Sequence, residues 1–119
     1  MKFSIKKSDK PDVFWDGFSA WVYNSDDDFN SASGLYIKLD GRHRKVKSKV
    51  SDRVYLVLRG EVEFDVDGKK LIAHKDDMII VPKNTPYDYW NRSTDTSELF
   101  LVHAPAYQYD QEVKYSEES

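Results

Sequence analysis

The stretch that decides the fold runs Glu61-Val62-Glu63-Phe64-Asp65-Val66-Asp67-Gly68-Lys69-Lys70-Leu71-Ile72-Ala73. Acidic and apolar residues alternate in its first half, so Val62, Phe64 and Val66 share one face of a β-strand. Asp67-Gly68 follows, a pair favoured in two-residue hairpin turns where both residues take positive φ. The sequence therefore predicts a β-hairpin whose return strand covers residues 70–73.

Short alternating segments continue on both sides of this hairpin, and long windows with helical periodicity are almost absent. Further strands are expected at residues 18–23, 35–39, 45–50, 53–58, 78–81, 87–91 and 99–103. Many short strands with turn signals at near-regular spacing are typical of a β-sandwich or barrel. We expect an all-β chain with N-terminal strands in 1–33 that complete a barrel, a barrel core in 34–105, and a polar C-terminal tail in 106–119. The alternative for this last segment is a strap laid on a neighbour.

Composition sets limits on function. The 119 residues fit one domain, and the formal net charge of -3 argues against a nucleic-acid partner. The absence of Cys excludes disulfides and thiolate metal sites. The N-terminus lacks the apolar stretch of a secretory signal, and no apolar run approaches the roughly 20 residues of a membrane span. A cytoplasmic protein without membrane contact is expected.

Two spaced motifs resemble those of the cupin family over roughly residues 34–105. Gly41 and Gly60 bracket the first motif, and the run Tyr55-Leu56-Val57-Leu58-Arg59-Gly60 matches its hydrophobic end. In the second motif Pro82 and Asn91 match by identity, while Asp76 and Asn84 stand where the family has glycine. Asp and Asn tolerate the left-handed backbone that such glycines adopt. The resemblance implies a cupin-type double-stranded β-helix, a jelly-roll barrel, and it also implies a homodimer.

At the metal-binding positions of the family, this sequence carries other residues. Metal-binding cupins hold a divalent ion with two His and a Glu from the first motif and one His from the second. With three residues before the Glu position, these places are taken by Lys47, Lys49, Arg53 and Tyr87. Protonated Lys and Arg repel a cation, and Tyr is a poor ligand at its usual pKa near 10. We therefore expect no metal and no other cofactor.

The alignment of the lysine strand leaves two alternatives open. In the first, Lys45, Lys47 and Lys49 face the barrel interior with Arg53 and form a cationic ligand site. In the second, four residues precede Arg53, so Val46 and Ser48 face inward and the lysines are solvated. Burying several unpaired cations is costly, which favours the second alternative.

Arg53 holds the position of the metal-binding Glu in either alignment. It is either the anchor for an anionic ligand or the partner of a carboxylate of the chain. Tyr87 should point into the barrel, with Tyr89 and Asn91 on the same face and Tyr55 two residues beyond Arg53. These residues are candidates for a ligand pocket, and the alternative for the tyrosines is plain aromatic core.

Candidate catalytic residues are Tyr87, as an acid, and His43, one of the few groups that titrate near neutral pH. Two function classes remain open, with a filled structural barrel as a third. The first is a metal-free module that binds a small polar or anionic ligand, such as a sugar acid or sugar phosphate. The second is a metal-independent isomerase, epimerase or lyase acting on a carbohydrate-like molecule. The second requires a base that faces Tyr87 inside the barrel.

Overall fold

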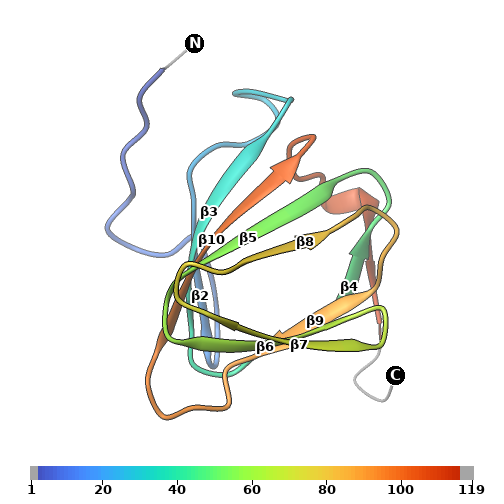
Figure 1. Cartoon of the computed structure of the whole chain (residues 1–119). Helices are drawn as coiled ribbons and strands as arrows, with labels where there is room; N and C mark the ends of the chain where they lie inside the picture. Colours follow the sequence, from blue (N-terminus) through green and yellow to red (C-terminus); the bar gives the residue numbers. More distant parts are fainter. Residues whose placement is uncertain (1–2, 116–119) are drawn as a thin grey trace.

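The computed structural model describes residues 3–115, and its strands form two antiparallel β-sheets that face each other (Figure 1). One sheet has the strand order β1-β2-β3-β10-β5-β8, and the other has the order β11-β4-β9-β6-β7. The strands of the first sheet are β1 (Val13–Trp15), β2 (Phe18–Val22), β3 (Ser33–Leu39), β10 (Ser97–Ala104), β5 (Asp52–Arg59) and β8 (Met78–Val81). Those of the second are β11 (Glu112–Lys114), β4 (Arg42–Ser48), β9 (Tyr87–Trp90), β6 (Glu61–Val66) and β7 (Lys69–His74). The jelly-roll barrel predicted from the sequence is confirmed.

The predicted hairpin forms the β6–β7 pair. Phe64 lies opposite Leu71 in the register, and the turn residues Asp67 and Gly68 have φ values of 52° and 85°. Asp76 and Asn84 have φ values of 74° and 63°, so these residues do adopt the left-handed backbone of the glycines they replace. The turns of the second motif therefore survive the loss of both glycines.

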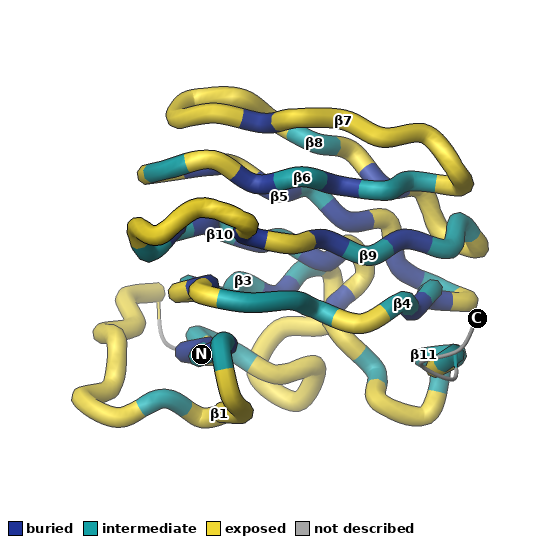
Figure 2. The backbone as a smooth tube through the Cα atoms, turned by 90° about the horizontal axis from the view of Figure 1, so that it is seen from below, coloured by how far each residue is buried: buried dark blue, intermediate teal, exposed yellow. Residues whose placement is uncertain are grey.

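The core lies between the two sheets and follows from the alternation along each strand. Figure 2 shows buried positions alternating with intermediate or exposed ones along β5, β6 and β10. Large rings fill much of the interior, with Tyr55, Phe64, Tyr87 and Tyr89 each at most 1% exposed. A barrel built from large aromatics gains a large buried apolar area from few residues.

The chain after β10 crosses from one sheet to the other. We call residues 105–115 the strap. The amide of Tyr107 donates to Ser33 Oγ at the start of β3, and Glu112 pairs with Ser48 of β4 through β11. A 3₁₀ turn, η1 (Tyr109–Gln111), precedes β11. The expected C-terminal segment therefore belongs to the barrel over its described part, and residues 116–119 lie outside the described residues.

Across residues 3–115, no helix is long and apolar enough to cross a membrane.

Candidate functional site

Three tyrosines form the centre of the site. Tyr55 comes from β5, and Tyr87 and Tyr89 come from β9 of the opposite sheet. The structure places all three inside the barrel, where the sequence predicted them. The hydroxyls of Tyr55 and Tyr87 are hydrogen-bonded at 2.6 Å, and the Tyr55 ring meets the Tyr89 ring edge-on with 5.1 Å between centroids. The cluster thus joins the two sheets at their inner faces.

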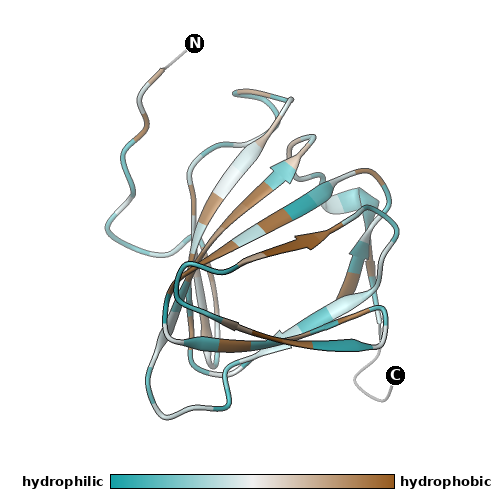
Figure 3. Ribbon diagram, in the orientation of Figure 1, coloured by the Kyte–Doolittle hydropathy of each residue, from teal (hydrophilic) through white to brown (hydrophobic). Residues whose placement is uncertain are grey.

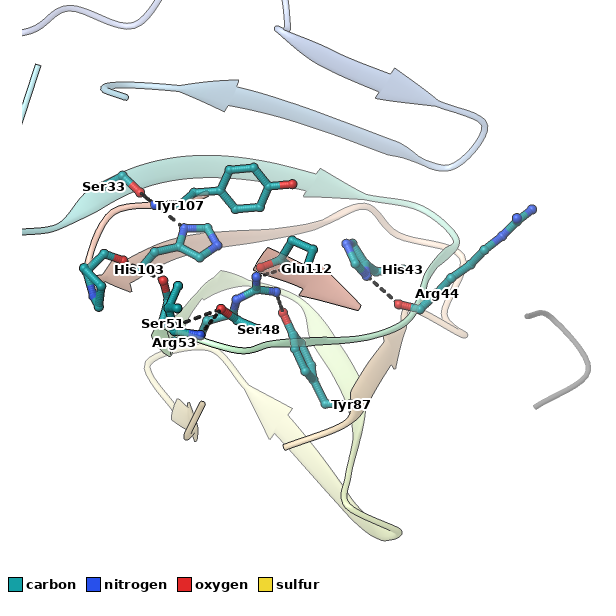
Figure 4. A network of polar contacts seen from close by, with 12 residues as sticks. Ser33, His43, Arg44, Ser48, Ser51, Arg53, Tyr87, His103, Tyr107 and Glu112 are labelled. Carbon is teal, nitrogen blue, oxygen red and sulfur yellow. Dashed lines mark hydrogen bonds and ion pairs between the residues drawn. The ribbon is translucent and has the colours of Figure 1, made fainter. Parts of the chain in front are cut away.

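Arg53 lies between Tyr87 and a carboxylate from the strap (Figure 4). Its Nη1 donates to Tyr87 Oη at 2.5 Å, and its Nη2 forms an ion pair with Glu112. The Arg53 and Glu112 side chains are 4% and 5% exposed. Of the two alternatives for Arg53, the structure shows the pair with a carboxylate of the chain, so the guanidinium does not depend on an anion from solution for its partner.

The surroundings shift the pKa values of the three tyrosines to different extents. Burial raises the pKa of Tyr55 and of Tyr89 well above the ordinary value. Burial also raises the pKa of Tyr87, but the charge of Arg53 and the hydrogen bonds from Tyr55 and Arg53 oppose the rise. A phenol whose anion is stabilised by a guanidinium releases its proton more readily than one that is only buried. Tyr87 is therefore the best placed of the three to act as an acid.

His43 faces this cluster from β4. Its ring stacks on Tyr89 with 4.9 Å between centroids and an angle of 15°, and it lies parallel to Tyr87 at 6.5 Å. His43 Nδ1 is 2.8 Å from the carbonyl oxygen of Arg44. Because a carbonyl only accepts, Nδ1 carries the hydrogen and Nε2 keeps its lone pair. Burial, together with the charge of Arg53, lowers the pKa of His43 to about 4 despite the opposing hydrogen bond to Arg44.

The other two histidines differ sharply in their surroundings. His103 of β10 is 2% exposed, lies 3.5 Å from Ser33 Oγ, and meets the ring of Tyr107 edge-on. Burial, with the charges of Arg53 and His43, lowers the pKa of His103 to about 3. The His74 side chain is 63% exposed at the end of β7. Only His43 combines an interior position with the tyrosine cluster.

Two groups of candidates do not line the site. Val46 and Ser48 are buried, so alternation places Lys47 on the outer face of β4, and Lys49 is exposed beyond the strand. Of the two alternatives for this strand, β4 adopts the second, which the cost of burying lysines favoured, so Lys47 and Lys49 are not the interior ligand residues of the first alternative. Asn91 is buried, but its Nδ2 donates to the carbonyls of Leu39 and Asp95 and its Oδ1 accepts from Ser93. Its side chain holds a loop and has no group left for a ligand.

The donor set does not fit the divalent ion of metal-binding cupins. In the register of the structure, the four family positions hold Val46, Ser48, Arg53 and Tyr87. These supply a methyl-bearing side chain, a hydroxyl, a permanent cation and a phenol whose pKa is raised. Ser48 Oγ is also engaged, since it accepts from the amides of Val50 and Ser51. Residues 3–115 contain no cluster of three or more His, Asp or Glu side chains arranged to hold a metal.

Glu112 is the interior residue that the sequence analysis missed. It lies in the polar segment after Pro105, where neither alternation nor a family motif marks an inward position. The one available signal was chemical: a buried Arg needs an acceptor, and the segment carries several carboxylates. Sequence alone did not show which of them would reach Arg53.

Comparisons with known proteins agree with this architecture. No curated protein matches the sequence. A variant of Streptomyces PAC13 with uridine has a TM-score of 0.84 at 22% identity, covering 98% of this chain and 92% of that one. A structure of Pac13 described as a nucleoside dehydratase gives 0.77 at 23% identity, covering 97% and 92%. KdgF from Halomonas sp. gives 0.73 at 16% identity, covering 85% and 89%.

At these identities the structural matches establish a shared fold. The sequence itself matches the model of the cupin domain over residues 39–103. Because this match spans more than half of the chain, and because the barrel and both motifs agree with it, the protein belongs to the cupin domain family.

Proposed function

We propose that this protein binds a small, polar, carbohydrate-like molecule inside the barrel and removes water from it without a metal. One observation carries the proposal: the unprotonated Nε2 of His43 belongs to a ring stacked on the tyrosine cluster. Metal-independent proton transfer requires a base and an acid within reach of one bound molecule. His43 and Tyr87 lie on the neighbouring strands β4 and β9 of one sheet, with 6.5 Å between their ring centroids. The proposed function thus selects the lyase among the enzyme classes that the sequence left open.

The residues divide the chemistry between them. His43 Nε2 takes a proton from a substrate carbon, and its low pKa keeps the imidazole neutral at pH 7, ready to accept. The electron pair of that C–H bond forms the new double bond, and the C–O bond of a hydroxyl one carbon further breaks. Tyr87 supplies the proton with which the hydroxyl leaves as water, and Arg53 stabilises the phenolate that remains. The proton on His43 then returns to Tyr87 through solvent.

These roles of His43 and Tyr87 limit which molecules can be substrates. A neutral imidazole of low pKa is a weak base, so the carbon that loses the proton has to be acidified by the substrate's own carbonyl. The negative charge that develops on this carbonyl offsets the positive charge that forms on His43. The substrate class is therefore a sugar derivative with a carbonyl next to a C–H and a hydroxyl one carbon beyond.

The structural relatives support a lyase of this kind. Pac13 is described as a nucleoside dehydratase, and uridine is a molecule that carries a sugar ring. Single variants solved with uridine replace one histidine in one case and one tyrosine in each of two others. The interior of this protein is likewise built from one histidine and a set of tyrosines.

The test follows the breaking of the C–H bond and the breaking of the C–O bond separately. Protein dialysed against EDTA is incubated in D₂O with a panel of sugar aldehydes and uronic acids, and proton NMR records two signals. One is the loss of the proton beside the carbonyl, and the other is the gain of a vinyl proton. We expect His43→Gln to slow both by about 10²–10⁴-fold. Tyr87→Phe should slow the appearance of the vinyl proton more than the exchange, because only the leaving group needs the acid.

His74→Gln is the matched control, since this histidine is exposed and outside the barrel interior. It should keep both rates. Retention of both rates in His43→Gln would show that His43 is not the base. An activity that disappears with EDTA and returns with a divalent ion would contradict metal independence.

A further inference from the structure

The part of the proposed site around Arg53 is closed, whereas His43 is partly exposed. Tyr55 and Tyr87 are each 1% exposed and Arg53 is 3% exposed, so a substrate reaches them only if a covering element moves. The Arg53 guanidinium, carried by β5, contacts β9 through Tyr87 and the strap through Glu112. β5 is paired on both sides, by β10 and β8, and β9 is paired by β4 and β6. Neither strand can leave without opening a sheet.

The strap is anchored at its beginning, where Ala106 is fully buried and the amide of Tyr107 donates to Ser33, but its end around β11 is held less firmly. β11 pairs with a single strand, β4, through three residues, and it forms the edge of its sheet. Its flanking backbone bonds run from the Lys49 amide to the Gln111 carbonyl at 2.9 Å and from the Tyr115 amide to the Lys45 carbonyl at 3.2 Å. No residue of η1 is buried, and Tyr109 is 69% exposed. Segments with few buried contacts and exposed backbone bonds open at the lowest cost in free energy.

Glu112 is the strap's contact with the site. Its carboxylate is buried against Nη2 of Arg53, while Arg53 Nε is buried without a hydrogen-bond partner (Figure 4). Glu112 thus leaves one buried donor of the guanidinium without a partner. A carboxylate that is free to orient binds Arg best with two parallel hydrogen bonds, a geometry that would also satisfy Nε.

We propose that the strap is the gate of the barrel and that Glu112 holds the place a substrate carboxylate takes when the strap opens. The proposal rests on the proposed function and narrows its substrate class to sugar acids. Removing Glu112 alone would leave a buried, unpaired guanidinium, which is strongly unfavourable. A neutral sugar therefore cannot replace Glu112, whereas a carboxylate can exchange with it and leave the charge of Arg53 balanced.

The first experiment measures the gate in the unaltered protein. Amide hydrogen exchange is recorded for Lys49, whose amide donates to the strap, and for Val57, whose amide donates to Asp77 outside the strap. Saturating D-glucuronate should lower the protection of the Lys49 amide by about tenfold or more, while that of Val57 is kept or rises. D-glucose, which lacks the carboxylate, should leave Lys49 unchanged. Increased protection of Lys49 with glucuronate would overturn the proposal.

The second experiment removes the competing carboxylate. Glu112→Gln should bind D-glucuronate about tenfold or more tightly than the unaltered protein in calorimetry. Asp110→Asn, in the same strap but on an exposed residue, should bind it as before. Unchanged or weaker binding by Glu112→Gln would contradict the proposal, as would release of the strap by inorganic phosphate but not by glucuronate. If one of these contradicting results is obtained but proton exchange still depends on His43, the proposed function stands and only the gate is refuted.

Discussion

His43 and His103 make folding stability depend on pH. The pKa values of His43 and His103 are lowered to about 4 and about 3, from 6.5 in the unfolded chain. The unfolded state therefore binds protons first as the pH falls. The stabilisation is fully present above about pH 6.5 and is lost as the pH decreases toward the folded values, by about 1.4 kcal/mol per pH unit for each group. Urea unfolding at pH 7 and pH 5 measures this loss.

The window between pH 6.5 and pH 5 isolates the histidines, because most carboxylates stay ionised there. His103→Gln should be less stable at pH 7 but should lose less stability on acidification than the unaltered protein. His74→Gln should follow the unaltered protein, since His74 is exposed. A pH dependence unchanged in both His103→Gln and His43→Gln would show that these rings are not kept neutral by the fold.

At the scale of single residues, spacing was informative where a family motif exists. Arg53 and Tyr87 were both expected inside because each holds a ligand position of the family, and the structure joins them by a hydrogen bond. Glu112 and His43 needed the fold itself. Glu112 reaches Arg53 because the strap pairs with β4, which local sequence does not show. His43 was a candidate from its residue type, but its tautomer depends on the backbone conformation that brings the Arg44 carbonyl to Nδ1.

At the scale of elements, two glycines with the same backbone test how tightly the turns are packed. Gly60 and Gly68 have φ values of 82° and 85°. A Cβ on Gly60 would lie 2.6 Å from the Oγ and 3.1 Å from the Cα of Ser97, whereas a Cβ on Gly68 meets nothing within 4 Å. We expect Gly60→Ala to cost about 2–5 kcal/mol, from backbone strain plus overpacking, and Gly68→Ala about 1 kcal/mol from strain alone. Equal losses in urea unfolding would show that the β5–β6 corner yields to the added methyl.

The elements also show where alternation is insufficient. β6 and β8 have the predicted bounds, because clear turn residues flank both. In β4 both faces carried plausible inward residues, and the choice depends on the cost of burying lysines rather than on the pattern. A register shift between His43 and Val46 adds to this, since an irregular strand breaks the strict period of two.

At the scale of the whole molecule, an apolar outer face remains uncovered. Leu56 of β5 lies opposite Met78 of the edge strand β8, and Leu56, Met78 and Ile80 are 37%, 59% and 62% exposed. Figure 3 shows β8 as a continuous hydrophobic strand at this edge. A contiguous apolar face of this kind marks an interaction surface, and we expect it to support the homodimer predicted from the family resemblance.

Light scattering at roughly 50 µM tests this expectation. The unaltered protein should be a dimer, and Ile80→Lys should be a folded monomer because a charge replaces an apolar contact. Val22→Lys is the matched control, since Val22 is 39% exposed on β2, with β3, β10 and β5 between it and β8. It should remain a dimer. A monomeric unaltered protein would count against this surface as an interface.

The proposed chemistry requires that His43 is a neutral base with its lone pair on Nε2. Nitrogen-detected NMR of the histidine side chains, recorded from pH 8 to pH 3, observes this state directly. We predict the Nδ1–H tautomer at neutral pH and a titration midpoint near 4 for His43. His74 serves as the exposed reference in the same spectra. A His43 midpoint at the ordinary value of about 6.5, or an Nε2–H tautomer at neutral pH, would contradict the account.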